Sequence, residues 1–431
     1  MGDRTHPAGS QGPAILRNMR LPTGAREHAW GNREVSETAV GKQSSRVPAL
    51  DGLRGAAALV VVFHHLSLLF GSVNATYFAP RSAEAHPPAW SLDWWVTSTP
   101  AQLLVAGPQA VLVFFVLSGL VVALPVLTRP TFSWISYYPQ RLTRLYVPAA
   151  ASVVLALAIR AVADALAAPG AAPAMAVGTS WQDVIGGLDL AFGNLSINVP
   201  LWSLRWEVVF SVALPLFVVL AVAGRSKWLI LTVLASAAAI IGNLNPSLTS
   251  FVFLPVFFIG TVIAVKFSSI RDWAANPNRT HRIKWIGFVT IVISILLTTS
   301  HATVVGLFPG KFRLQEAAAS VEFVGCIGLV LVAAFWRPAA RVLSQTFFQW
   351  LGRISFSLYL VHAPIIVAAY TIIGPGRPWT TVGAALVVSL VVAESFCRLV
   401  EIPSHKLSRR MGASSSSAMT EWFRPSDRLA R

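Results

Sequence analysis

An arginine and a histidine stand eleven residues apart in a largely apolar stretch near the start of the chain. Only Gly, Ala, Leu, Val, Phe and a second histidine, His64, separate Arg54 from His65. In an α-helix, eleven residues rise about 16 Å, and eleven steps of about 100° return a side chain to within about 20° of its starting direction. Arg54 and His65 are therefore expected on one helix face, and His64 on another.

These residue types suit proton transfer in a site shielded from water. A buried histidine such as His65 can take the proton of a hydroxyl group as the oxygen attacks a thioester. A carboxylate on its other ring nitrogen would fix the tautomer and stabilise the imidazolium. The alternative is that Arg54 is an anchor at the membrane surface and that His65 is a hydrogen-bonded core residue.

His362 and Glu207 also lie in apolar surroundings, where ionisable side chains are costly and mark functional positions. His362 follows Arg353 by nine residues, half a turn out of phase, so the two do not share a helix face. A role in helix packing is as well supported for His362 as a catalytic one. Glu207 could pair with Arg205 or orient a histidine of another helix.

Acidic residues near the end of the apolar part complete this set. Glu394 and Arg398 have the i, i+4 spacing of a structural ion pair. Glu401, a few residues further on, could neutralise Arg54 or Arg353.

The composition indicates that membrane-spanning helices carry these residues. Of 431 residues, 55% are hydrophobic and 12% are charged, which is about half the charged fraction of soluble domains. The apolar stretches approach the roughly 20 residues that a spanning helix needs. The sequence therefore predicts an all-α, polytopic membrane bundle of about ten helices, at 53–72, 102–127, 145–168, 204–223, 228–243, 249–267, 283–300, 317–335, 354–373 and 379–402.

The connections between these spans predict the topology. Lys and Arg concentrate in every second connection, as on the cytoplasmic side of multi-pass proteins, whereas the connection 169–203 contains neither. Both tails, 1–47 and 406–431, are therefore expected on the cytoplasmic side of the cell membrane, and 1–47 and 407–431 are interpreted as disordered. No apolar stretch precedes the first span, which is expected to act as the insertion signal. Residues 181–193 are interpreted as an interfacial helix.

Four arginines lie at the predicted cytoplasmic ends of spans. Guanidinium groups bind phosphate through paired hydrogen bonds and stay charged, so these residues match the phosphates of coenzyme A. No Gly-rich phosphate-binding loop of the nucleotide-binding kind is present in the sequence. The four arginines are Arg54, Arg141, Arg144 and Arg353.

Charge and cysteine content exclude other classes. The formal net charge of +16 could indicate nucleic acid, but the basic residues lie between spans and in the tails, not in one patch, so no nucleic-acid partner is expected. Cys326 and Cys397 both fall in apolar spans and are interpreted as small core residues. Their spacing is not that of a zinc site, and no metal is expected.

Six segments, in this order, resemble the motifs of the acyltransferase-3 family of integral membrane O-acyltransferases. The first is LDGLRGAAALVVVFHH, which contains Arg54 and His65 at the family's spacing. The others are FFVLSG at 114–119, RLTRLYVP at 141–148, WSLRWE at 202–207, LGRISFSLYLVHAP at 351–364 and Glu401-Ile402-Pro403. They cover about residues 48–405, and the chain is identified by them as a member of this family.

The resemblance implies a transmembrane acyltransferase domain over 48–405 with a ten-helix core and a cytoplasmic acyl-CoA donor, often acetyl-CoA. It implies that His65 and Arg54 are essential, that Arg141 and Arg144 help to hold the donor, and that Glu207 supports activity. The same motifs supply possible substrate-binding residues: Ser118, Trp202, Ser203, Tyr359 and His362.

The chain departs from the family pattern in two ways. Members often have an acidic pair and a tyrosine after the fourth motif, where this chain has Val208 and Ser211. No hydrolase domain of the SGNH type follows the last span. The acyl group is therefore expected to pass directly to the acceptor or to a separate partner protein.

The leading hypothesis is an O-acyltransferase with His65 as general base. It would move an acetyl or other short acyl group from acyl-CoA to a hydroxyl of a cell-envelope glycan, glycolipid or similar acceptor. The alternative is a secondary transporter or flippase for a polar lipid or small molecule, because intramembrane His, Arg and Glu also suit a substrate path. The sequence shows no inverted repeat of the kind common in transporters. A third hypothesis, a membrane sensor or scaffold, would not explain why Arg54 and His65 lie on one helix face.

Overall fold

The structure is a computed structural model that describes residues 47–78, 87–168, 181–190, 193, 197–248 and 250–422. In these ranges every regular element is a helix, which confirms the predicted all-α class. The predicted N-terminal tail, apart from Val47, lies outside the described residues, as do residues 423–431.

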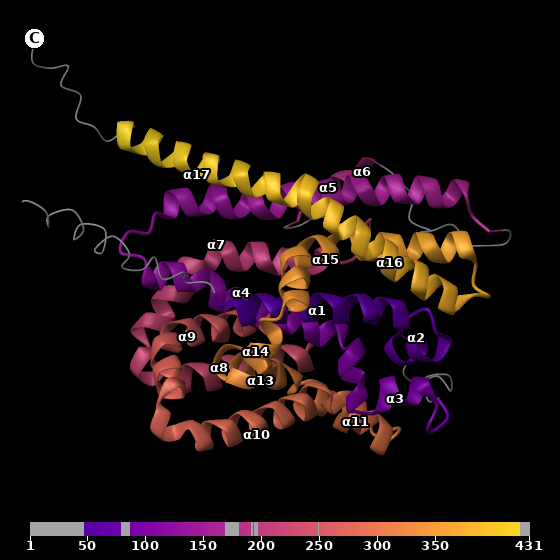
Figure 1. The fold of residues 1–431 in the computed structure, drawn as a ribbon, viewed down its shortest axis with the longest axis horizontal. Helices are drawn as coiled ribbons and strands as arrows, with labels where there is room; N and C mark the ends of the chain where they lie inside the picture. Colours follow the sequence, from indigo (N-terminus) through magenta and orange to yellow (C-terminus); the bar gives the residue numbers. More distant parts are fainter. Residues whose placement is uncertain are drawn as a thin grey trace, which may run out of the picture. The chain divides into compact units, whose positions relative to one another are not determined.

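Long helices alternate with short ones along the chain (Figure 1). The long helices are α1 Pro48–Ser67, α4 Gly107–Thr128, α5 Trp134–Ala165, α7 Leu201–Ala223, α8 Trp228–Leu244, α9 Ser250–Ala275, α10 Thr280–Thr298, α13 Glu322–Phe335, α15 Thr346–Ile373, α16 Pro378–Phe396 and α17 Ile402–Trp422. The short ones are α2 Gly71–Phe78, α3 Leu92–Ser98, η2 Pro100–Val105, α6 Trp181–Leu188, η3 Arg225–Lys227, η4 Pro246–Leu248, η5 Pro277–Arg279, α11 Ser300–Leu307, α12 Phe312–Ala319, α14 Arg337–Leu343 and the π-helix η6 Cys397–Glu401.

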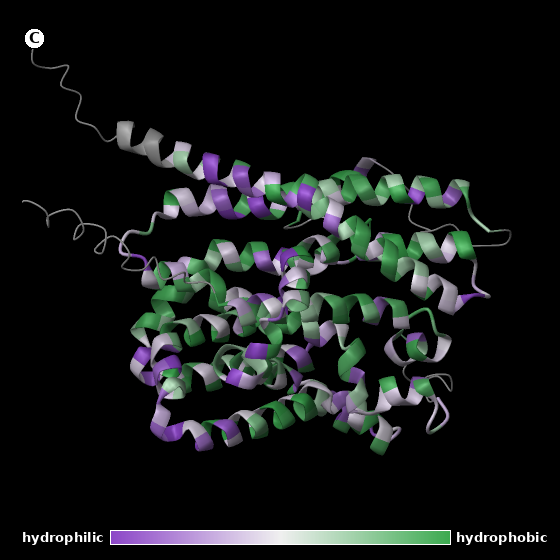
Figure 2. Ribbon diagram, in the orientation of Figure 1, coloured by the Kyte–Doolittle hydropathy of each residue, from purple (hydrophilic) through white to green (hydrophobic). Residues whose placement is uncertain are grey.

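Ten helical segments in the described part of the chain are long and apolar enough to cross a membrane, which confirms the predicted count. Figure 2 shows their continuous apolar stretches. Large apolar side chains on α8 and α10, such as Val233 and Phe288, are exposed, as expected of helices that face lipid. The segment predicted as an interfacial helix contains α6, where Trp181 and Ile185 are exposed.

Glycines bring α1 against α15, and α4 against α9, at positions next to predicted site residues. Gly55 lies so close to the backbone of α15 that a Cβ atom would clash with it. Gly119 and Gly260 face each other across the α4–α9 crossing in the same way. Small residues permit such close approach between membrane helices. The crossings fix the helix positions of Arg54 and Ser118, which directly precede Gly55 and Gly119.

The segment before α7 is anchored inside the bundle. Asn198 is fully buried and donates through Nδ2 to Ser152 Oγ on α5 at 3.0 Å and to the Leu360 carbonyl on α15 at 2.9 Å. Helix α7 therefore begins between α5 and α15. This start places the first turns of α7, with Ser203 and Glu207, beside both helices.

The prediction that residues 407–431 are disordered is wrong for 407–422, which belong to helix α17. The π-helix η6 leads into α17, which remains helical to Trp422. Ser404, Ser408 and Gly412 are buried at intervals of four residues, and α17 packs along α5 (Figure 1). The serine-rich composition suggested disorder, but the regular spacing of small residues permits close helix packing.

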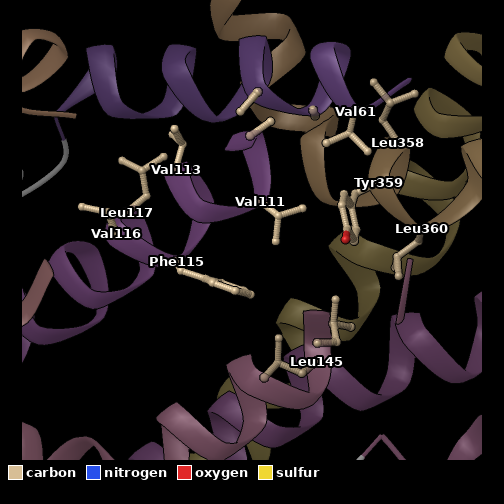
Figure 3. Packing of buried hydrophobic residues seen from close by; sticks show 14 of the residues in the cluster. Val61, Val111, Val113, Phe115, Val116, Leu117, Leu145, Leu358, Tyr359 and Leu360 are labelled. Atoms are coloured by element: carbon tan, nitrogen blue, oxygen red, sulfur yellow. The ribbon is translucent and has the colours of Figure 1, made fainter. Parts of the chain in front are cut away.

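The apolar core surrounds the predicted site. Val61 of α1, Phe115 of α4, Leu145 of α5 and Leu358 of α15 belong to one buried cluster. Figure 3 shows Tyr359 among these side chains, where its hydroxyl group brings a polar atom into the core. Since lipid is as apolar as these residues, close packing rather than exclusion of water holds the helices together.

Candidate active site

A cavity of about 140 Å³ lies among α1, α4, α5, α7, α15 and α17. Phenylalanine and leucine side chains form its apolar surface, and charged or hydroxyl-bearing residues form the rest. Most of the predicted site residues meet here although they come from distant parts of the sequence. The polar lining consists of Arg54, Ser118, Arg141, Arg144, Ser203, Glu207, Ser355, Tyr359, Glu401 and His405.

Glu207 occupies one wall of the cavity and is held by α4 and α5. Its Oε1 atom pairs with the guanidinium of Arg141 and accepts a hydrogen bond from Ser118 Oγ at 2.5 Å. Arg141 also donates to Ser211 Oγ at 3.1 Å. The suggested pairing of Glu207 with Arg205 is wrong, because Arg205 instead donates to the Gly193 carbonyl at 2.7 Å.

Arg54 and Arg144 supply positive charge without a matching ion pair. Neither guanidinium forms a salt bridge with another described residue, although both lie close enough to Glu401 for their charges to interact. Glu401 is buried and accepts a hydrogen bond from Ser357 Oγ at 2.6 Å. The part of the cavity lined by Arg54, Arg144 and Glu401, here called the cationic wall, therefore carries more positive than negative charge.

Arg353 does not line the cavity, unlike the other arginines predicted to bind the donor. It pairs with Glu394 at 3.1 Å. Glu394 also accepts from Arg398 at 2.6 Å and from Trp350 Nε1 at 3.0 Å. The predicted pairing of Glu394 with Arg398 is confirmed, and Glu394 rather than Glu401 is the partner of Arg353.

Tyr359 and Ser203 form another wall of the cavity. The Tyr359 hydroxyl and Ser203 Oγ lie 2.7 Å apart, in a hydrogen bond that either group can donate. The Tyr359 ring meets that of Phe114 edge-on, with 5.7 Å between centroids. The Tyr359 ring is also 5.9 Å from the ring of His362. Tyr359 thus stands between the cavity and the histidines.

His65 and His362 form a direct pair beyond Tyr359. His65 Nδ1 lies 3.2 Å from His362 Nε2 and 2.9 Å from the Val61 carbonyl. His362 Nδ1 lies 3.0 Å from the Leu358 carbonyl. A carbonyl can only accept, so two neutral rings would carry their protons on Nδ1, and His362 Nε2 would accept from His65. The arrangement leaves Nε2 of His65 as an unprotonated nitrogen that can take a proton.

His64 faces a second polar cluster, made of Tyr77, Gln102, Gln109, His301 and Glu322. The His64 ring contacts that of Tyr77 at 4.7 Å, and its Nδ1 donates to the Val105 carbonyl at 3.0 Å. Burial raises the pKa of Tyr77. Tyr77 accepts a hydrogen bond from Gln102 Nε2 at 3.3 Å.

Glu322 is the acidic member of this second cluster and is buried. It accepts from Gln109 Nε2 at 2.8 Å and from the backbone N–H of His301 at 3.3 Å. Burial lowers the pKa of the His301 ring. Both carboxylate oxygens of Glu322 therefore have donors within the protein.

Four of the predicted residues do not line the cavity, and two residues of the site were missed. The four are His65, Trp202, Arg353 and His362. Trp202 is 37% exposed, with its ring 5.5 Å from that of Phe253, and His65 contacts the cavity lining only through its neighbours. Sequence reasoning did not identify Asn198 or His405. The four-residue spacing of Glu401 and His405 was a usable signal, whereas Asn198 lies in a loop with no pattern.

The family model described as an acyltransferase domain matches residues 47–396. The chain therefore belongs to the acyltransferase-3 family, as its motifs indicated, and is a multi-pass membrane protein. This membership does not favour a transporter or flippase.

The chain is similar to three curated relatives. It is 22% identical over 400 residues to the peptidoglycan O-acetyltransferase OatA of Listeria monocytogenes, covering 84% of this chain and 56% of the relative. It is 23% identical over 401 residues to the putative peptidoglycan O-acetyltransferase YrhL of Bacillus subtilis, covering 83% and 54%. It is 24% identical over 400 residues to the acyltransferase MdmB of Streptomyces mycarofaciens, covering 85% and 93%.

The chain thus spans about half the length of the two peptidoglycan relatives and nearly all of MdmB. No solved structure matches the chain.

Proposed function

We propose that this protein is an acyl-CoA-dependent O-acyltransferase of the cell membrane. It moves a short acyl group, acetyl or similar, from the cytoplasm to a hydroxyl of a cell-envelope glycan, glycolipid or similar acceptor. The names of the relatives support this assignment, since two refer to peptidoglycan O-acetylation and one to acyl transfer. The distribution of Lys and Arg supports cytoplasmic termini and a cavity that opens to the cytoplasm.

One observation carries the proposal. Arg54 and Arg144 have no salt-bridge partner among the described residues, and they line a cavity that ends against Tyr359, next to the His65–His362 pair. Guanidinium groups held this way suit the phosphates of coenzyme A. The thioester end of the donor then lies toward Tyr359.

In the proposed reaction, His65 Nε2 takes the proton of the acceptor hydroxyl. The hydroxyl oxygen attacks the thioester carbonyl and forms the ester bond, the carbon–sulfur bond breaks, and the proton passes to the coenzyme A thiolate. His362 holds His65 in the tautomer with a free Nε2 atom. Because Tyr359 separates the cavity from His65, the proposal requires its ring to turn aside.

The test is gene deletion followed by mass spectrometry of envelope glycans and lipids. We expect an acyl modification to disappear on deletion, to return with the wild-type gene, and to stay absent with His65→Ala. Loss of a general base lowers the rate by about 10²–10⁴-fold, so the product should fall below detection.

His64→Ala is the matched control, because His64 neighbours His65 but bonds to the Val105 carbonyl and is given no role in proton transfer. This variant should restore the modification. Both variants should reach the membrane at wild-type levels. Restoration of the modification by His65→Ala would reject the proposed base.

A further inference from the structure

The cationic wall of the cavity extends beyond the residues that the family model covers. Glu401, His405 and Arg409 recur at intervals of four residues at the junction of η6 and α17, so they lie along one side of the helix. His405 lines the cavity. Arg409 lies close enough to both His405 and Arg144 for their charges to interact. Helix α17 therefore adds a charge next to the motif arginines.

The net charge of the cationic wall is positive, which favours the binding of an anion. Arg141 is paired with a glutamate, whereas Arg54, Arg144 and Arg409 have no ion pair with any described residue. Glu401 is the one remaining carboxylate of the cavity lining. Like charges held together are destabilising unless something offsets them, and a ligand with several negative charges would do so.

The Arg409 side chain is exposed and is oriented by its own helix. Its Nε atom donates to the His405 carbonyl at 3.3 Å, which leaves the terminal guanidinium nitrogens available to a ligand. Arg409 stands one turn, or about 6 Å along the helix, beyond the cavity residue His405. A ligand group that binds it would lie just outside the cavity.

We propose that Arg409 of α17 binds the 3′-phosphate of the coenzyme A donor, while Arg54 and Arg144 bind its diphosphate. The inference rests on the proposed acyl-CoA donor. The ribose 3′-phosphate and the diphosphate are separate anionic groups at the nucleotide end of coenzyme A, and a set of separate guanidinium groups matches both. The donor site then includes a helix that begins after residue 396, the last residue matched by the family model.

An anionic phospholipid headgroup offers the same phosphate chemistry at this position. The experiment therefore uses the full chain in nanodiscs of phosphatidylcholine alone, which carry no net charge. Calorimetry measures the affinity for coenzyme A and for dephospho-coenzyme A, which lacks only the 3′-phosphate. We expect the wild type to bind coenzyme A about tenfold more tightly, as the loss of a charge-assisted contact predicts.

Arg409→Gln should lower the affinity for coenzyme A about tenfold, to the level of dephospho-coenzyme A. The affinity for dephospho-coenzyme A should not change. Arg410→Gln is the matched control, because it removes the same charge from the same exposed helix one residue, or about 100°, away. It should leave both affinities unchanged.

Two outcomes would overturn the inference without touching the proposed function. One is equal binding of the two ligands by the wild type, and the other is an unchanged preference for coenzyme A in Arg409→Gln, as expected if Arg409 contacts only lipid headgroups. A wild type that binds neither ligand would instead reject the donor proposal and this inference with it. Size-exclusion profiles and thermal unfolding of the variants establish that they are folded.

Discussion

Two polar regions of the molecule differ in how their charged groups are paired. In the cluster around Glu322, both carboxylate oxygens accept hydrogen bonds from the protein, one from Gln109 and one from the backbone of His301. In the cavity, Arg54 and Arg144 lack a salt bridge with any described residue. Glu322 is buried, and a buried charge is costly unless it is paired or hydrogen-bonded. Arg54 is half-buried and Arg144 is exposed, so their charges are open to a ligand. We conclude from this contrast that the Glu322 cluster stabilises the structure, whereas the cavity is suited to bind an anionic ligand.

Replacement of Arg144 should produce the largest loss of coenzyme A affinity, and the absence of such a loss would contradict a ligand-binding role for the cavity. Arg144→Gln removes a guanidinium with no ion pair among the described residues, so we expect coenzyme A affinity to fall about a hundredfold, with little change in thermal unfolding. Calorimetry on the purified protein measures the affinity. Arg398→Gln, which affects an exposed i, i+4 pair, should leave the affinity unchanged; a loss as large as that of Arg144→Gln would mean that general charge, not the cavity, binds the donor.

Replacement of Tyr359 tests where the cavity ends. Tyr359→Ala should shift the preference from acetyl-CoA toward butyryl-CoA by about tenfold, because each of the two additional methylenes gains about 0.8 kcal/mol when buried. The measurement is the ratio of kcat/KM for the two donors. Tyr359→Phe keeps the ring and should keep the wild-type ratio. An unaltered ratio in Tyr359→Ala would place the acyl group elsewhere.

Replacement of Glu322 tests whether its cluster stabilises the fold without taking part in ligand binding. Glu322→Ala should lower the free energy of unfolding by about 1–3 kcal/mol, because the Gln109 amide and the His301 N–H lose their acceptor. Coenzyme A affinity should remain that of the wild type. Glu322→Gln, which still accepts a hydrogen bond, should be destabilised less. Thermal unfolding and ligand binding are measured on the same samples, and reduced affinity in Glu322→Gln would show that the two regions are not independent.

Much of the scaffold was predictable because single-residue properties determine it. Hydropathy gave the number of spanning helices, since each must present about 20 apolar residues to lipid. The motif order gave the family. Four arginines were predicted at the cytoplasmic ends of spans, and the structure brings three of them, Arg54, Arg141 and Arg144, to the cavity.

The pairings inside the bundle could not be predicted because they depend on helix positions in three dimensions. Glu207 pairs with Arg141 because a buried asparagine anchors the start of α7 between α5 and α15, a fact that hydropathy does not encode. Arg353 pairs with Glu394 because α16 packs against α15. The helical state of α17 was missed because serine-rich composition outweighed the four-residue spacing of its buried positions.

A π-helix, Cys397–Glu401, joins α16 to α17. A π-turn holds one more residue than an α-turn, so the helix absorbs an additional residue there and the residues that follow keep nearly the directions of a continuous α-helix. Deletion of one residue from this turn should therefore leave Ser404, Ser408 and Gly412 against α5. Deletion of one residue from α17 itself has no such turn to absorb it, and it should rotate every later side chain, including Arg409, by about 100°.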